Sequence, residues 1–122
     1  MKSEDIKFKG KVLNSGEWVI GDLLHRITDT CIAVKDMDDI IYYPIDPATV
    51  CQFTGLKDCE GNEVWEGDIV EFETYDLYKG NVKTEAVIEY ISSGYVAVTD
   101  GIPYSLCTNC IKVVGNKFDK EK

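Results

Sequence analysis

Residues 52–70 read QFTGLKDCEGNEVWEGDIV, and in this stretch two turn signals alternate with two short apolar runs. Gly55 closes the first run, and residues 60–62 supply Glu, Gly and Asn, which adopt the tight or positive-φ conformations that a hairpin requires. A second strand begins after Gly67. Because nothing in the stretch marks a reactive centre, it predicts turns and strands that build a fold.

The strand pattern continues on both sides of this stretch. Lys7, Lys9 and Lys11 alternate with Phe8 and Val12, which is the two-residue period of a half-buried strand. We interpret the three lysines as a solvated strand face, with contact to an anion as the alternative. Other short runs rich in β-branched and aromatic residues occupy residues 17–27, 30–36, 38–45, 50–55, 66–75, 82–91, 95–101 and 110–115.

Helical patterns are nearly absent from the sequence. Residues 46–49 (DPAT) predict a single helical turn in which Asp46 caps the N-terminus and Pro47 takes the first helical position. Residues 77–81 (LYKGN) break the strand pattern and predict a loop. No longer window carries an apolar stripe at helical spacing, so we expect little helix.

Length and charge limit the possible functions. A chain of 122 residues with 44% hydrophobic content is long enough for one domain with a core, or for two small barrels that share one. Asp and Glu outnumber Lys and Arg by 22 to 13, which gives a net charge of −9. Because nucleic-acid binding depends on Lys and Arg that neutralise phosphates, we expect no direct nucleic-acid binding.

The N-terminal residues predict the compartment. Charges are scattered through residues 1–18 without a continuous apolar block, so we expect neither a signal peptide nor a membrane anchor, and a cytoplasmic location. The chain holds five cysteines, and an odd number in a reducing compartment favours free thiols over disulfides.

Cys107 and Cys110 form the motif CTNC, which on its own is half of a zinc site or a redox pair. The other residues able to complete a site are dispersed in the sequence: Cys31, Cys51, Cys59 and His25. A structural zinc needs four ligands, and a thioredoxin-like pair opens a helix, whereas this motif runs into a strand. We therefore predict no metal site and no redox site, and interpret the cysteines as half-buried thiols.

Clustered carboxylates have a structural explanation. Asp36, Asp38 and Asp39 lie at a turn, where solvated Asp side chains are common, so we favour a turn over acid–base catalysis. Glu66 and Asp68 are able to bind a cation weakly, but an Asp at the start of a strand usually accepts hydrogen bonds from turn backbone. No nucleophile elbow or phosphate-binding loop is present. The sequence thus predicts no catalytic, cofactor-binding or metal-binding residue, and no cofactor.

The chain contains seven Tyr together with Trp18 and Trp65, enough for a platform that stacks on single-stranded nucleic acid. Such platforms lie beside a positively charged groove, whereas the neighbours here are Glu, Asp and isolated Lys. We therefore expect these aromatic side chains to fill the core or to form a protein–protein surface.

Residues 15–24 and 61–70 form a weak internal echo. Aligned without gaps, they share one Glu, one Gly and one Asp: Glu17 with Glu63, Gly21 with Gly67 and Asp22 with Asp68. Two explanations stay open, a duplicated β unit or two hairpins that use the same turn chemistry.

Three segments, at residues 6–13, 52–72 and 110–119, together resemble the YopX family, whose members occur in phages, prophages and other mobile elements. We call the residues that carry this resemblance the family signature: Thr54-Gly55-Leu56-Lys57-Asp58, Gly61, Glu66-Gly67-Asp68-Ile69-Val70 and Val114-Gly115-Asn116. The resemblance implies a compact fold of β-barrel units with an SH3-like C-terminal part. No catalytic or binding residue is established for the family, so none is carried over, and Cys59 and the CTNC motif depart from its pattern.

Pattern and resemblance lead to the same architecture. We expect an all-β chain that forms one domain of residues 1–122, a compact β-barrel-type fold of two intertwined small barrel units with little helix. Residues 1–50 would form the N-terminal β unit and residues 51–61 a bridging turn segment. Residues 62–117 would form the SH3-like C-terminal unit, in which a longer first loop joins the first two strands. Residues 118–122 would be a frayed tail.

The preferred functional hypothesis is a non-enzymatic accessory protein of a phage or mobile element that acts through protein–protein contacts with itself or with a host factor. An exposed edge strand with aromatic neighbours favours homo-oligomers. The alternative is an acidic decoy or regulator that occupies the basic nucleic-acid-binding surface of another protein. We expect no enzyme activity, because no set of residues meets the first geometric requirements of catalysis.

Overall fold

The computed structural model describes residues 6–91, 94–106 and 111–119. Strands make up 67% of the described residues and helical residues 6%, which confirms the all-β class with little helix. The strands are β1 (Phe8–Lys11), β2 (Trp18–His25), β3 (Thr30–Asp36), β4 (Asp39–Pro44), β5 (Cys51–Lys57), β6 (Glu63–Trp65), β7 (Asp68–Asp76), β8 (Gly80–Ile91), β9 (Gly94–Thr99), β10 (Ile102–Ser105) and β11 (Lys112–Asn116). The helical segments are the short 3₁₀ helices η2 (Pro47–Thr49) and η3 (Lys117–Asp119). Neither of these helices has the length or apolar content needed to cross a membrane.

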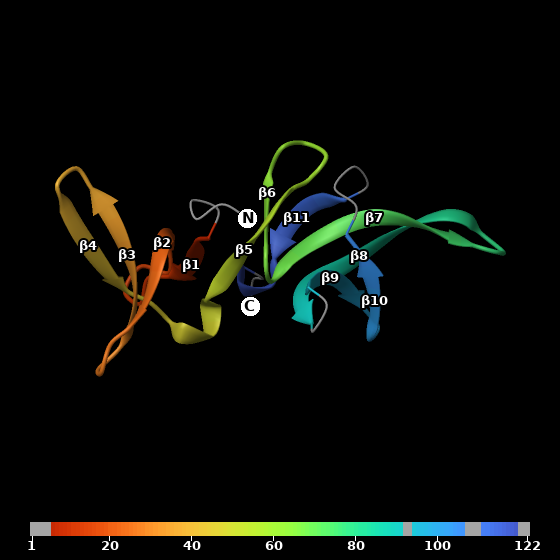
Figure 1. The fold of residues 1–122 in the computed structure, drawn as a ribbon. Coiled ribbons are helices and arrows are strands. Elements are labelled where there is room, and N and C mark those ends of the chain that lie inside the picture. Colours follow the sequence, from red (N-terminus) through yellow and green to blue (C-terminus); the bar gives the residue numbers. More distant parts are fainter. Residues whose placement is uncertain (1–5, 92–93, 107–110, 120–122) are drawn as a thin grey trace. The chain divides into compact units, whose positions relative to one another are not determined.

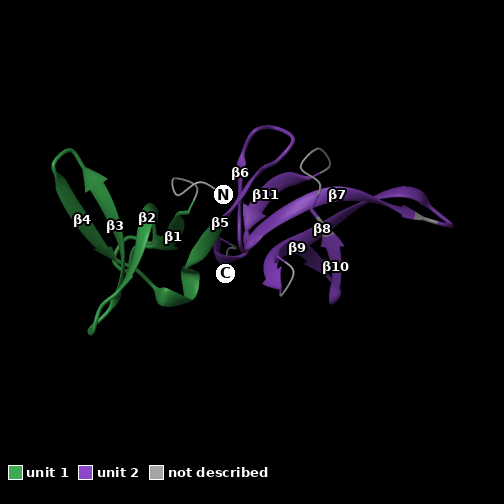
Figure 2. Ribbon diagram, viewed as in Figure 1, with its two compact units in different colours: residues 1–53 green, residues 54–122 purple. Residues whose placement is uncertain are grey.

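The chain divides into two compact units, residues 1–53 and residues 54–122, which Figure 2 shows in green and purple. We call them unit 1 and unit 2. The division falls inside β5, within the segment that the sequence predicts as a bridge. The first residues of β5 pair with β1, where Gln52 lies opposite Phe8, and β6 is the neighbour of β5 in the sheet order.

Unit 1 is an antiparallel meander of β1 to β4, and β5 returns beside β1. Its buried apolar side chains are Cys31, Ile32, Ile45, Cys51 and Phe53. A Cβ atom at Gly10 would overlap the side chain of Ile45, so only glycine allows this close approach. The predicted helical turn is confirmed: Asp46 is the N-cap of η2 and accepts a hydrogen bond from the backbone N–H of Ala48 at 3.0 Å.

Unit 2 is built on a five-stranded antiparallel sheet in the order β10-β9-β8-β7-β11. One face of this sheet packs into a buried cluster formed by Val64, Val70, Ala86, Ile88, Ala97 and Ile111. The rings of Phe72 and Tyr104 extend this cluster in an edge-to-face contact, with centroids 5.4 Å apart. Full burial of a side chain such as Ile88 stabilises the fold by roughly 2 to 3 kcal/mol.

The two units repeat one strand order. In each, four consecutive strands form a meander and a fifth strand returns beside the first, as β4-β3-β2-β1-β5 in unit 1 and as β10-β9-β8-β7-β11 in unit 2. This repeat matches β1 with β7, whereas the weak sequence echo pairs residues of β2 with residues of β7. The echo therefore does not mark the structural repeat. Shared turn chemistry does not explain it either, because Gly21 and Asp22 lie within β2 whereas Gly67 lies in the turn before β7 with φ of 88°.

The expected closure into barrels is not observed. The described strands form two open antiparallel sheets and no closed barrel. The outermost strand of the unit 2 sheet, β10, contains Pro103, which has no N–H group to donate to a further strand. Alternation of side chains predicts which face of a strand is apolar, but not which strand closes the sheet.

The longer first loop expected in unit 2 is instead a regular hairpin. β7 and β8 pair continuously from Ile69 opposite Val87 to Asp76 opposite Gly80, so only residues 77–79 remain as the turn. Figure 1 shows this hairpin extending well past the other strands of unit 2. We call its outer part, residues 72–86, the arm.

Candidate interaction surface

Four polar residues of the family signature are buried, whereas Lys57 is exposed and Glu66 is half-buried. Thr54 and Asp58 are each 6% exposed, Asp68 is 3% exposed and Asn116 is 4% exposed. All four lie in unit 2. Buried polar groups cost free energy unless they are hydrogen-bonded, so their partners decide whether they serve the fold or a ligand.

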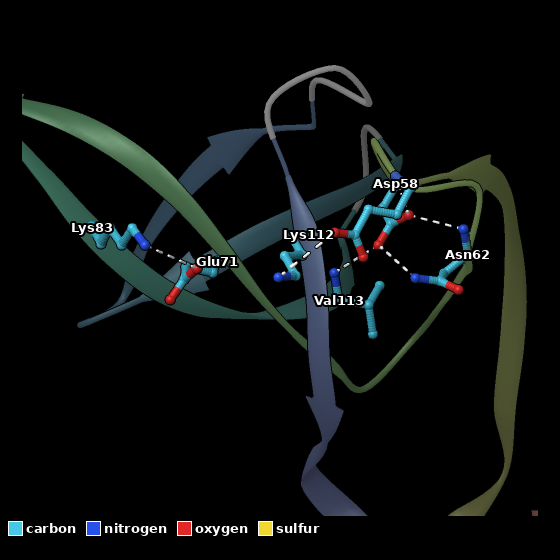
Figure 3. Close-up of polar contacts among 7 residues, drawn as sticks. Asp58, Asn62, Glu71, Lys83, Lys112 and Val113 are labelled. Atoms are coloured by element: carbon cyan, nitrogen blue, oxygen red, sulfur yellow. Dashed lines mark hydrogen bonds and ion pairs between the residues drawn. The ribbon is translucent and has the colours of Figure 1, made fainter.

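The carboxylate of Asp58 accepts four hydrogen bonds (Figure 3). The backbone N–H groups of Glu60 and Asn62 donate to Oδ1 at 2.9 and 2.8 Å, and the Asn62 side chain donates to Oδ2 at 3.3 Å. The backbone N–H of Val113 donates to Oδ2 at 2.9 Å, across 55 residues of sequence. Asp58 thus shapes its own turn and fastens it to β11.

Opposing effects act on the pKa of Asp58. Burial on its own would raise the pKa, because it disfavours the charged form. Hydrogen bonds from Val113, Asn62 and Glu60 stabilise the carboxylate more strongly, so the pKa of Asp58 lies below its ordinary value. The carboxylate is therefore ionised and committed to the turn.

Asp68 and Asn116 form a second buried pair. Oδ2 of Asp68 accepts a hydrogen bond from the backbone N–H of Trp65 at 2.8 Å, which confirms the predicted bond to turn backbone. Oδ1 of Asp68 accepts one from the Asn116 side chain at 3.0 Å, and Asn116 in turn accepts one from the N–H of Phe118 at 2.9 Å. Within residues 6–91, 94–106 and 111–119, no buried side-chain nitrogen or oxygen lacks a hydrogen bond.

Thr54 and Gly67 complete this network. The hydroxyl of Thr54 donates to the backbone carbonyl of Val64 at 2.7 Å and accepts from the N–H of Leu56 at 3.2 Å. Gly67 is buried with φ of 88°, a conformation that favours glycine. The buried polar residues of the signature therefore stabilise the fold of unit 2, and their side-chain polar groups are hydrogen-bonded within it.

The cysteines do not assemble with other candidate ligands in the described part of the chain. Cys31 and Cys51 are buried free thiols and Cys59 is an exposed one, and no three His, Cys, Asp or Glu side chains come close enough together to hold a metal ion. Burial raises the pKa of Cys31, which keeps it in the unreactive thiol form. His25 is exposed at the end of β2. The CTNC motif at residues 107–110 lies outside the described residues.

The carboxylates singled out in the sequence take the structural roles expected of them. Asp36 and Asp39 pair at the ends of β3 and β4, and Asp38 lies in the exposed turn between them. Glu66 is half-buried, whereas Asp68 belongs to the hydrogen-bonded pair above. The three Asp side chains thus belong to a solvated turn, and Asp68 marks the start of a strand.

Unit 1, by contrast, presents an uncovered apolar face. Opposed residues of antiparallel strands share a face, and the registers place Ile20 opposite Lys9, Trp18 opposite Lys11 and Ile40 opposite Lys35. Residues two apart along a strand join them. The same side also holds the fully buried Cys31 and Cys51, so only part of it is uncovered. We call its solvent-accessible charged and large apolar members on β1 to β4 the lysine face: Lys9, Lys11, Trp18, Ile20, Asp22, Leu24, Lys35, Ile40 and Tyr42.

The lysine face is exposed and carries more positive than negative charge. Ile20 is 47% exposed, Ile40 55% and Tyr42 46%. The ammonium groups of Lys9 and Lys11 lie 4.5 and 5.4 Å from the centre of the Trp18 ring. Asp22, also exposed, occupies the same side of β2. Large apolar side chains flanked by charges in this way are typical of surfaces that bind proteins.

Arg26 contacts the lysine face at Tyr42. Its guanidinium makes two hydrogen bonds to Asp29, at 2.7 and 2.8 Å, and lies 5.8 Å from the centre of the Tyr42 ring. The hydrogen bond to Arg26 lowers the pKa of Asp29, so the pair stays charged. This pair fixes the turn between β2 and β3 beside the exposed ring.

The two tryptophans differ in surroundings. Trp65 is 4% exposed and belongs to the interior of unit 2, whereas Trp18 is half-buried and lies under the lysines of the lysine face. The expectation of core filling fits Trp65. The sequence indicated the lysine stripe but not the exposure of Ile20, Ile40 and Tyr42, because alternation gives the side of a strand and not what covers it.

Fold and surface together define a small all-β protein whose buried polar network serves the structure and whose unit 1 exposes apolar side chains beside lysines. The YopX family model, described as YopX protein, matches residues 5–120, which is nearly the whole chain. The chain therefore belongs to the YopX family. No curated protein matches it.

Proposed function

We propose that this protein is a non-enzymatic accessory protein of a phage or other mobile element, and that it acts by binding another protein through the lysine face of unit 1. The face suits a segment that offers apolar side chains together with carboxylates. Apolar burial would supply affinity, and the lysines would supply orientation and faster association. The resemblance to YopX proteins supports the mobile-element setting.

The proposal depends on one observation: exposed apolar side chains and lysines lie together on one face of unit 1. Ile20 on β2 and Ile40 and Tyr42 on β4 expose large apolar surface on the same side of the sheet, with β3 between the two strands. A monomer would be expected to bury such surface. The lysine face combines three lysines with Asp22, while the chain as a whole carries −9. This local reversal of charge favours an acidic partner.

The absence of enzyme activity is part of the proposal. The buried polar side chains of the signature all have hydrogen-bond partners, and the exposed His25 lies at the end of β2. An open hollow of about 590 Å³ in unit 2 includes Glu71, Lys83 and Lys112 in its lining. Lys83 pairs with Glu71 at 3.9 Å and Lys112 pairs with Glu60 at 3.7 Å (Figure 3). Both lysines of the hollow are therefore neutralised by neighbouring carboxylates.

The same ion pairs weaken the decoy hypothesis. A protein that imitates the phosphates of a nucleic acid needs carboxylates without neighbouring cations. Here Lys83 and Lys112 lie among the acidic residues of the unit 2 sheet. The observation supports protein contacts through unit 1 over charge mimicry by unit 2.

Affinity capture from host cells with matched variants tests the proposal. Ile20→Ser with Ile40→Ser removes two side chains that are 47% and 55% exposed on the lysine face, and Val114→Ser with Ile102→Ser removes two that are 46% and 53% exposed in unit 2. The wild type and the unit 2 variant should capture the same protein, and the lysine-face variant should lose it. The captured protein should stay bound at high salt, because apolar contacts are not screened.

Two results would contradict the proposal. Equal capture by all three proteins would remove the lysine face from the contact. Capture of basic nucleic-acid-binding proteins that salt releases, with no difference between the variants, would favour the decoy.

A further inference from the structure

The arm of unit 2 is a two-stranded ribbon with free edges. β7 pairs with β11 only over Asp68–Glu71, and β8 pairs with β9 only from Val87 onward. Residues 72–76 and 80–86 therefore pair with each other and with no third strand in the described part of the chain. Such a ribbon is marginally stable in water, and its edges offer unpaired backbone N–H and C=O groups.

The tip of the arm exposes large side chains. Tyr75 is 71% exposed, Leu77 83% and Tyr78 95%. The arm carries three acidic residues and two lysines, so it is nearly neutral within a chain of net charge −9. Two copies of the arm would therefore approach without the repulsion that opposes contact elsewhere.

We propose that the free edge of β8 pairs with the same edge of a second copy, antiparallel and about a twofold axis, with Val82 opposite Val82 of the second copy. The result is a four-stranded ribbon in the order β7-β8-β8-β7 and an isologous dimer. The proposal uses unit 2 and does not depend on the lysine face.

Charge excludes two neighbouring registers. An axis at Lys83 would place two identical lysines directly opposite each other. An axis at Asn81 would place Lys83 opposite Lys79 of the second copy. Like charges in direct opposition destabilise strand pairing, so neither register is favourable.

The existing pairing of β8 excludes a third register. An axis at Thr84 would bring Gly80 of the second copy opposite Ile88. The outer edge of β8 at Ile88 is already taken by β9, where Ile88 lies opposite Ala97. A strand cannot pair twice along one edge.

The register about Val82 satisfies both conditions. Gly80 lies opposite Thr84 and Asn81 opposite Lys83 of the second copy, all within the free edge. Continuing the register brings Lys79 beside Glu85 of the second copy, twice over by symmetry. These opposite charges favour the pairing.

The same register gives the exposed tip of the arm a binding position. It places Leu77 and Tyr78 next to residues 85–87 of the second copy. An open hollow of about 310 Å³ lies there, lined by Ile69, Glu85, Ala86, Val87, Val98, Thr99 and Asp100. An exposed apolar tip and a partly apolar hollow at the end of the free edge are complementary features of one surface.

Sedimentation equilibrium of the full chain under reducing conditions, which prevent cross-linking through the exposed Cys59, tests the proposal. The wild type should have the mass of a dimer. Val82→Lys and Val82→Glu should each raise the dimer dissociation constant about a hundredfold, because like charges then face each other at the axis. An equimolar mixture of the two variants should recover the dimer mass, because opposite charges then meet.

Two further variants provide controls. Val114→Lys places the same charge on another exposed strand position of unit 2 and should leave the dimer intact. Tyr78→Ser should raise the dissociation constant about tenfold, because the tip loses its apolar contact. Circular dichroism confirms that each variant is folded.

A wild type that is monomeric throughout the micromolar range would overturn the proposal. So would a Val82→Lys variant that dimerises as well as the wild type, a charge-swapped mixture that stays monomeric, or a Val114→Lys variant that dissociates as readily as Val82→Lys.

Discussion

At the scale of single residues, the signature carboxylates act as internal acceptors. Asp58 receives hydrogen bonds from both ends of its turn and from β11, and Asp68 receives them from Trp65 and Asn116. A backbone N–H bound to an ionised carboxylate contributes more than a neutral hydrogen bond. Loss of either carboxylate should therefore lower the free energy of unfolding.

Replacing Asp58 with Asn should lower the free energy of unfolding by about 2 kcal/mol at neutral pH, because the amide cannot accept all the bonds that the carboxylate accepts. The folded pKa of Asp58 is depressed, so its stabilisation is present above the ordinary pKa of Asp, about 4, and is lost as the pH falls through the folded value. The deficit of the variant should therefore shrink in acid. Urea unfolding at a series of pH values measures it.

The exposed Asp38 supplies the control for this experiment, and Asp38→Asn should unfold like the wild type. A deficit of Asp58→Asn that stays constant down to low pH would show that the charge of Asp58 does not stabilise the fold.

The sequence predicted the local hydrogen bonds of these residues and missed the distant ones. Asp46 with Ala48 and Asp68 with Trp65 are two and three residues apart, so turn chemistry indicates both. The bond of Asp58 to Val113 spans 55 residues and depends on the completed fold. A single sequence contains no signal for such a pair.

At the scale of elements, side-chain alternation predicted nearly every strand, because the period of two is imposed by the strand itself. It also predicted most of both strands of the arm, in the runs at residues 66–75 and 82–91. Only the loop predicted at residues 77–81 was too long, because Gly80 and Asn81 belong to β8 and the turn is residues 77–79.

The hairpin between β3 and β4 contains an unfavourable residue. Met37 has φ of 56° and is 88% exposed, so it adopts a left-handed conformation without packing in return. Met37→Gly should raise the free energy of unfolding by about 0.5 to 1 kcal/mol, since glycine adopts this conformation without strain. Urea unfolding followed by circular dichroism measures the change.

Asp38, in the same turn, is the matched control. Its φ is not positive, so Asp38→Gly should give no gain and a small loss from the added freedom of the unfolded chain. Equal effects of glycine at the two positions would rule out strain at Met37.

At the scale of the whole molecule, our proposal assigns structural and contact roles to different units. The buried polar residues of the signature lie in unit 2, while the lysine face lies in unit 1. β5 contains residues of both units, and the unfolding of the chain as one cooperative unit stays a prediction. Sequence alone could not locate the contact surfaces, because an apolar side chain is exposed or buried only by what packs over it.

The central claim is that the signature holds the fold and leaves binding to exposed surfaces, and native-state hydrogen exchange tests it most directly. The amides of Trp65 and Val113 donate to the buried carboxylates, so they should exchange as slowly as the amide of Ile88 in the core strand β8. The amide of the exposed turn residue Asp38 should exchange fast. Exchange of Trp65 and Val113 at the rate of Asp38 would contradict the account.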